Sequence, residues 1–158
     1  MVKMIRIDDR LLHGQVMVSW IKYLRIQGIL IVSDSVASDE MKKMAVTVAK
    51  PADIRLFIKN VEEGIAAMEK LNGFSYDSLV IVENVADARR LVENCPCLKG
   101  ITVNMGGQKM AEGRRRLADL VCLSEQDIED LRQIEAAGAK VEVRKLSSET
   151  PKKLSDIV

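Results

Sequence analysis

The residues best suited to chemistry lie near the amino terminus, in the stretch RIDDRLLHGQV (6–16), which holds His13, the only histidine in the chain. A neutral imidazole is a good nucleophile, and its ordinary pKa near ~6.5 leaves most of it neutral at pH 7. Arg10 stands three residues earlier, and a guanidinium matches the oxygens of a phosphoryl group. Gly14 follows His13 directly and lets such a group approach the backbone closely. A nucleophile, a cation and room for an anion are the parts that phosphoryl transfer requires.

The two aspartates in this stretch leave alternatives open. Either Asp8 or Asp9 could hold Arg10, or orient the imidazole through its second nitrogen. The plainer interpretation is a solvated turn with a local salt bridge, in which His13 is structural or simply exposed. The residue pattern by itself does not separate these interpretations.

A second candidate loop, NMGGQK (104–109), contains the glycine pair Gly106 and Gly107. The pair indicates either N–H groups that face a phosphate or a plain tight turn. No GK[ST] follows, so the loop is not a Walker motif, and the chain has no G-x-G-x-x-G dinucleotide fingerprint. Nucleotide cofactors are therefore disfavoured.

Composition excludes several classes of protein. The chain has 158 residues, 47% hydrophobic and 30% charged, with a formal net charge of +1, which suits a globular domain without the basic field that nucleic acid requires. Two Phe, two Tyr and one Trp are too few for base stacking. Cys95, Cys97 and Cys122 lack metal-site spacing and are expected to be reduced thiols. Without a signal peptide or an apolar run of ~18 residues, a cytosolic location is expected.

Two hydrophobic periods alternate along the chain. Short apolar runs predict strands at residues 2–7, 29–32, 54–58, 79–82, 101–103, 120–123 and 141–143. Helical spacing and caps predict helices after residue 14 and at residues 39–50, 60–71, 86–94 and 124–137. This alternation favours an α/β fold, a doubly wound, mostly parallel central sheet of about seven strands with helices on both faces. One domain over 1–158 is expected, with a polar tail from about residue 147.

In such a sheet, ligands bind at the carboxyl ends of the strands. This rule selects the loops at residues 8–15, 33–38, 83–84 and 104–109, which would form one surface if their strands are neighbours. The run Arg114–Arg116 is interpreted as a solvated helix face or as a docking patch for an acidic partner.

The stretch IRIDDRLLHGQV, followed by Trp20, closely resembles the enzyme IIB component of the mannose/fructose/sorbose class of the bacterial sugar phosphotransferase system. The resemblance continues through VSDSVASDEMKKMA, ITVNMGGQK and LVCLSEQDIEDLRQIEAAGAKVEV, and so spans nearly the whole chain. The core D-D-R-L-x-H-G-Q is its most specific part. Ser33-Asp34 departs from the Asn-Asp pair associated with the family, and the tail KLSSETPKKLSDIV has no clear match.

The resemblance implies that His13 receives a phosphoryl group on Nδ1 from a phosphorylated IIA protein or domain. His13 would then pass the group to a sugar bound by the membrane IIC–IID transporter, with which the chain would associate peripherally. Arg10 would neutralise the migrating charge and Asp9 would orient the imidazole. The site would be lined by Gly14, Gln15, Asn104, Gly106 and Gly107. No metal or diffusible cofactor is expected, the donor would be a separate chain, and a homo-oligomer stays open.

Two other functions use the same residues. A non-catalytic anion-binding or regulatory α/β module needs the same loops but no nucleophile. A small hydrolase with His13 as its base is disfavoured, because no G-x-S-x-G elbow is present. Whether His13 ever carries phosphate separates the first two functions.

Overall fold

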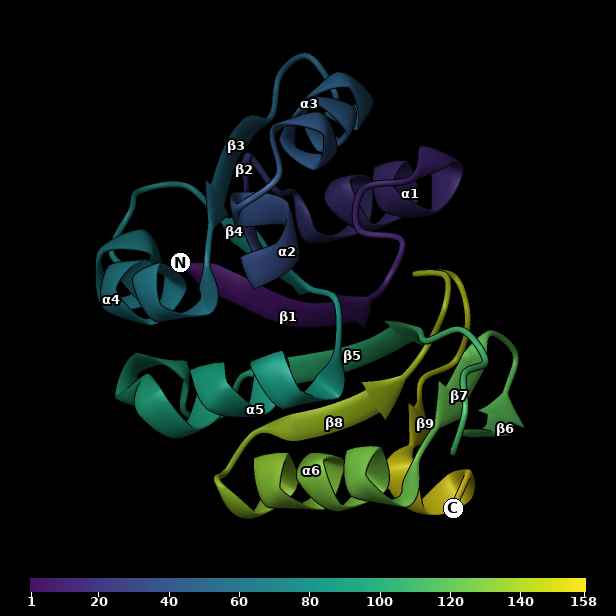
Figure 1. The fold of residues 1–158 in the computed structure, drawn as a ribbon. Helices are drawn as coiled ribbons and strands as arrows, with labels where there is room; N and C mark the ends of the chain where they lie inside the picture. Colours follow the sequence, from purple (N-terminus) through teal and green to yellow (C-terminus); the bar gives the residue numbers. More distant parts are fainter.

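A computed structural model describes the backbone of residues 1–158 and all side chains except those of Gln15 and Val16. Its central sheet has seven strands in the order β3-β2-β4-β1-β5-β8-β9 (Figure 1). Every neighbouring pair runs parallel except β8 and β9. The predicted α/β class and mostly parallel sheet are confirmed.

The elements follow the predicted alternation closely. The strands of the sheet are β1 (Val2–Asp8), β2 (Gly28–Val32), β3 (Arg55–Lys59), β4 (Ser78–Val82), β5 (Thr102–Gly107), β8 (Lys140–Val143) and β9 (Lys152–Lys153). The helices are α1 (Gly14–Leu24), α2 (Asp34–Ala37), α3 (Glu40–Ala49), α4 (Val61–Asn72), α5 (Val85–Asn94) and α6 (Glu125–Ala136). Short 3-10 turns cover Pro96–Leu98 and Leu154–Asp156. Asn60 and Ser124, the first residues of two predicted helices, both form capping boxes.

Helices cover both faces of the sheet, as predicted. Apolar residues of α1, α2 and α3 pack against one face, and those of α4, α5 and α6 pack against the other (Figure 1). Neighbouring residues of β2 alternate between the two layers, since Ile29 and Ile31 join the first and Leu30 and Val32 the second. Within the described residues, no helix has the length and apolar character needed to cross a bilayer.

The carboxyl-terminal third differs from the predicted arrangement. The predicted strand at residues 120–123 is not part of the central sheet, because β7 (Val121–Leu123) pairs antiparallel with β6 (Arg115–Ala118) in a separate two-stranded sheet. The expected polar tail instead supplies β9, and Leu154 beyond it is buried. Strand β9 is only two lysines long, so no hydrophobic period could reveal it.

The run Arg114–Arg116 is not a helix face, since Arg115 and Arg116 begin strand β6. Each of the three arginines has a carboxylate within 4 Å, and the partners of Arg114, Arg115 and Arg116 are Asp127, Glu125 and Asp119 in turn. The guanidinium charges are therefore partly compensated within the chain.

The strand order determines which loops meet. The chain passes from β1 out to β2 and β3, returns to β4 beside β1, and then crosses to β5 on the other side of β1. The carboxyl end of β1 therefore lies between those of β4 and β5, where ligands bind in doubly wound sheets. This order brings the loop after β1 next to the loops after β4 and β5.

The surroundings of Gly64 show how closely α4 packs on the sheet. A Cβ added there would lie 2.9 Å from Cγ2 and 3.0 Å from Cγ1 of Val32, whose branched side chain has few alternative rotamers. Overpacking of ~1–3 kcal/mol should outweigh the ~1 kcal/mol that alanine adds to helix stability. We expect Gly64→Ala to unfold at a lower urea concentration than the unmodified chain, as followed by circular dichroism. Ala66→Ser, at an exposed position of the same helix, is the control, and an unchanged midpoint for Gly64→Ala would contradict the packing argument.

Candidate functional site

The site is organised by Asp8, the last residue of β1, whose side chain is fully buried. Its Oδ1 accepts hydrogen bonds from Arg10 Nε at 3.0 Å and from the Arg10 backbone N–H at 3.1 Å. Its Oδ2 accepts from Arg10 Nη2 and from Arg6 Nη2, both at 3.0 Å. The two-pronged contact with Arg10 holds that guanidinium in one orientation.

His13 stands beside this cluster as the N-cap residue of α1. Its Nδ1 lies 3.2 Å from the Leu11 carbonyl oxygen, and its Nε2 lies 3.8 Å from Asp8 Oδ2. Because a carbonyl only accepts hydrogen bonds, Nδ1 carries the proton in this arrangement and Nε2 holds the lone pair. Nε2 is buried and has no hydrogen-bond partner among the described groups.

The start of α1 adds a second anion-attracting feature. The His13 side chain makes no capping hydrogen bond to α1, and no acidic residue lies in the first turn of this helix. The first N–H groups of a helix and its dipole favour a negative charge. Gly14 is the first helical residue and has φ +41°, a left-handed value that suits glycine. A phosphoryl group on His13 would therefore form next to a helix N-terminus.

Arg6 also belongs to the site, although it was not among the residues predicted from the sequence. It is completely buried, its Nη1 donates to Asn104 Oδ1, and its guanidinium lies 5.3 Å from the Trp20 ring. The carbonyls of Arg144 and Lys145 accept from the same guanidinium at 3.4 and 3.2 Å. A buried charge needs such partners, so Arg6 serves to compensate Asp8. The available sequence signal was a charged residue inside an otherwise apolar strand.

The glycine pair does not form the tight turn considered as one of its two uses. Gly106 and Gly107 are buried at the end of strand β5 and do not form a tight turn. A Cβ on Gly106 would overlap the Arg6 guanidinium, and a Cβ on Gly107 would lie 3.1 Å from Arg10 Nη2. The pair therefore makes room for the two arginines that hold Asp8. Asn104 is also buried, and its amide bonds to Arg6 and Glu142.

The hydrogen bonds of Asp9 go to backbone groups at the end of β5 and in the loop after it, and not to the imidazole. Its Oδ2 accepts from the Lys109 backbone N–H at 2.7 Å, and its own N–H donates to the Gly107 carbonyl at 3.2 Å. Asp9 thus ties the loop after β1 to the loop after β5, and the structure favours Asp8 as the orienting carboxylate. The side chain of Gln15 lies outside the described residues.

Two surface hollows flank the tie between Asp9 and Lys109. One, of about 390 Å³, extends from Arg10 and Leu12 to helix α3, and the other, of about 340 Å³, extends from Arg10 towards Leu120. Both leave space for a partner beside the Arg10 guanidinium.

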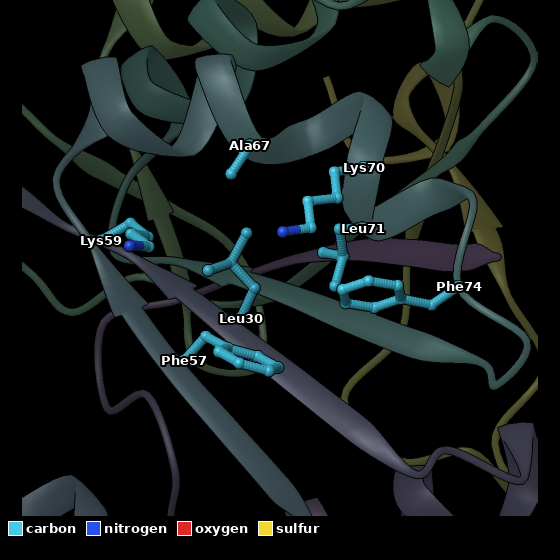
Figure 2. Close-up of a pocket in the computed structure, with 7 residues that line it drawn as sticks. All are labelled: Leu30, Phe57, Lys59, Ala67, Lys70, Leu71 and Phe74. Carbon is cyan, nitrogen blue, oxygen red and sulfur yellow. The ribbon is translucent and has the colours of Figure 1, made fainter.

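A third hollow, of about 210 Å³, lies between β3 and α4 on the other face of the sheet. Phe57, Leu30 and Phe74 form its apolar wall, and Lys70 extends over it (Figure 2). None of its lining residues belongs to the loop after β1.

Metal binding finds no support in the side chains that the structure describes, since no three His, Cys, Asp or Glu residues there come together as ligands. The three cysteines are free thiols, and burial raises the pKa of Cys95 to about 11. Cys95 is therefore a protonated, unreactive thiol at neutral pH.

The pKa of His13 is lowered from its ordinary value, chiefly because burial disfavours the charged ring. Asp8 raises this pKa, while Arg10 and Arg6 lower it. The net lowering leaves the imidazole neutral at pH 7, the form that has a lone pair.

A titration of the single imidazole by NMR should therefore give a midpoint below 6.5. Arg10→Ala should raise the midpoint, because it removes a nearby positive charge, whereas Lys22→Ala on the distant end of α1 is the control. Protonation then favours the unfolded chain, so this group's contribution to stability is lost as the pH falls below 6.5. A midpoint at or above 6.5 in the unmodified chain would contradict this assignment.

Comparison with known proteins shows to which family this chain belongs. The family model of the PTS system sorbose subfamily IIB component matches residues 2–158. The chain is 33% identical over 144 residues to the fructose-specific EIIB component of Bacillus subtilis, covering 91% of this chain and 87% of that protein. It is 33% identical over 153 residues to the mannose-specific EIIAB component of Escherichia coli K12, covering 97% of this chain but only 47% of that protein. The chain thus spans about half the length of that relative.

Solved structures agree with these matches. The IIB domain of the sorbose permease from Klebsiella pneumoniae superposes with a TM-score of 0.90 at 28% identity, covering 98% of this chain and 94% of that one. An N-acetylgalactosamine-specific IIB component from Escherichia coli gives a TM-score of 0.89 at 26% identity, with coverage of 97% and 99%. The chain belongs to the sorbose subfamily of IIB components of the sugar phosphotransferase system.

Proposed function

We propose that this chain accepts a phosphoryl group on His13 from a phosphorylated IIA protein and passes it to a sugar during uptake through a membrane IIC–IID transporter. The observation that carries the proposal is the placement of His13. The only histidine stands at the N-terminus of α1, beside an arginine that the buried Asp8 holds in place. Family membership supports a phosphotransferase role in general.

The first transfer exchanges one N–P bond for another. The lone pair of a neutral ring nitrogen of His13 attacks the phosphorus of the donor's phosphohistidine. The new N–P bond forms as the donor's N–P bond breaks, and that electron pair returns to the donor imidazole. Arg10 and the N–H groups at the start of α1 stabilise the charge on the phosphoryl oxygens during transfer.

The second transfer returns His13 to its starting state. A sugar hydroxyl oxygen attacks the phosphorus, its proton passes to a base of the acceptor complex, and the N–P electron pair returns to His13. The site holds the phosphoryl group with one arginine and backbone N–H groups, which suits a carrier that must also release it.

Transfer through Nδ1 requires a change of ring orientation. In the structure Nδ1 donates to the Leu11 carbonyl, so the Nδ1 proton must pass to solvent water, Nε2 must take up a proton from water, and the ring must turn before Nδ1 can present its lone pair. Asp8 Oδ2 lies 3.8 Å from Nε2 in the present orientation, and a shift of the ring towards it would let Nε2–H donate a hydrogen bond to this carboxylate. We therefore assign the orienting role in this proposal to Asp8.

The direct test is acid-labile phosphorylation with phosphoenolpyruvate, the general phosphotransferase proteins and a cognate IIA protein. We expect phosphorus NMR of the chain, separated from the donor proteins after the reaction, to show a phosphohistidine bonded through Nδ1. His13→Ala should give no such signal, and its circular dichroism should match that of the unmodified chain. If the unmodified chain stays unphosphorylated beside a fully phosphorylated IIA protein, a non-catalytic anion-binding module becomes the better conclusion.

Variants of the three charged loop residues should separate catalysis from stability. Arg10→Ala should slow phosphorylation by about 10²-fold, because it removes a preorganised positive charge. Asp8→Asn should also lower stability by ~3–5 kcal/mol, since it leaves the buried Arg6 uncompensated. Asp9→Asn, which keeps an oxygen that can accept from Lys109 N–H, is the control and should retain a rate nearer to that of the unmodified chain. Stopped-flow phosphorylation and urea unfolding measure the two effects, and a greater loss of rate in Asp9→Asn than in Asp8→Asn would reverse the assignment.

A further inference from the structure

We propose that an exposed apolar stripe on helix α3, formed by Met41, Met44 and Val48, is a docking surface for the phosphorylated IIA protein. The inference rests on the proposed function and adds the residues by which the donor would be held. The relative exposures of these side chains are 83%, 69% and 81%. Among the side chains that the structure describes, no other helix has three large apolar residues this exposed.

The stripe is a feature of one helix face. Positions 41, 44 and 48 are three and four residues apart, so they lie in a row along the helix. Val46, by contrast, is buried against the sheet. The outer face of a surface helix is usually polar, and exposed apolar residues gathered together mark sites of interaction. Packing within this chain does not explain the stripe.

The stripe borders the hollow beside the candidate site. Lys42 and Ala45 of α3 line the hollow of about 390 Å³ together with Arg10 and Leu12. With 3.6 residues per turn, Ala45 lies only about 40° around the helix from Met41. A partner that covers the hollow above Arg10 therefore extends onto the stripe.

Charge favours the phosphorylated donor as the occupant. The hollow contains Arg10, Lys42 and Lys109, and the two lysines form no ion pair with the described carboxylates. Its carboxylates, Asp9 and Glu83, already accept hydrogen bonds from within the chain. A donor brings an anionic phosphoryl group to this position, whereas the transporter brings an uncharged sugar hydroxyl. Cations beside an apolar stripe complement the donor better.

Methionine also suits the kind of contact that a carrier needs. Its flexible, polarisable side chain adapts to different surfaces, and methionine-rich surfaces bind without strict shape matching. A donor must leave after each transfer, so the contact has to be short-lived. Two methionines and a valine add apolar contact without a deep pocket that would hold the donor in place.

The test compares phosphorylation of His13 by a phosphorylated cognate IIA protein across variants of α3. We expect the double variant Met41→Glu/Met44→Glu to lower the second-order rate constant at least about tenfold, which corresponds to ~1.4 kcal/mol of binding free energy. The rate at saturating IIA protein should stay near that of the unmodified chain, because the stripe does not touch His13. Met41→Leu/Met44→Leu should restore normal transfer, since it keeps the apolar surface.

Thr47→Glu is the matched control, because it adds a negative charge to an exposed position of the same helix outside the stripe. An equal loss of rate in Thr47→Glu would overturn the proposal, since charge alone would explain the effect. Unchanged kinetics in the double variant, with the unmodified chain phosphorylated normally, would also overturn it. Normal acceptance from IIA combined with impaired sugar phosphorylation in transporter vesicles would assign the stripe to the transporter instead. If the unmodified chain accepts no phosphoryl group, the proposed function itself fails.

Discussion

A single buried carboxylate, Asp8, imposes the main constraint on this structure. It lies at the end of the central strand β1 with no solvent exposure, so its charge must be compensated within the chain. Arg6 supplies compensation from inside the protein and Arg10 from the surface side. Removing one partner from such a cluster leaves an uncompensated buried charge, which is costly. The position of Arg10 beside His13 is therefore tied to the stability of the fold.

The surroundings of Arg6 extend this constraint to distant parts of the chain. The guanidiniums of Arg6 and Arg144 lie 5.3 and 4.8 Å from the centroid of the Trp20 ring, whose Nε1 donates to the Lys145 carbonyl at 2.9 Å. Such cation–π contacts contribute more when they are shielded from water. The segment after β8 thereby contacts both Arg6 and Trp20. Residues near both ends of the chain therefore surround Arg6, which pairs with Asp8.

In the same arrangement a rigid, buried cluster lies beside a partly exposed histidine, the proposed nucleophile. The Asp8 cluster is buried and densely hydrogen-bonded, whereas His13 is 23% exposed and contacts it only at 3.8 Å. Burial keeps the imidazole neutral, and the start of α1 offers N–H groups instead of further cations. A site of this kind attracts a phosphoryl group without enclosing it, as the proposed transfer to and from two partners requires.

Local patterns in the sequence determined the α/β alternation, the helix caps and the loop that holds His13 and Arg10, because these depend on neighbouring residues. Tertiary structure alone decided which aspartate faces the imidazole. Side chains alternate along a strand, so extending β1 to Asp8 places that carboxylate on the same face as Arg6 and turns Asp9 towards Lys109. The use of Gly106 for the Arg6 guanidinium and the pairing of β9 with β8 also join residues far apart in sequence. Such contacts depend on strand order and register, which no local pattern encodes.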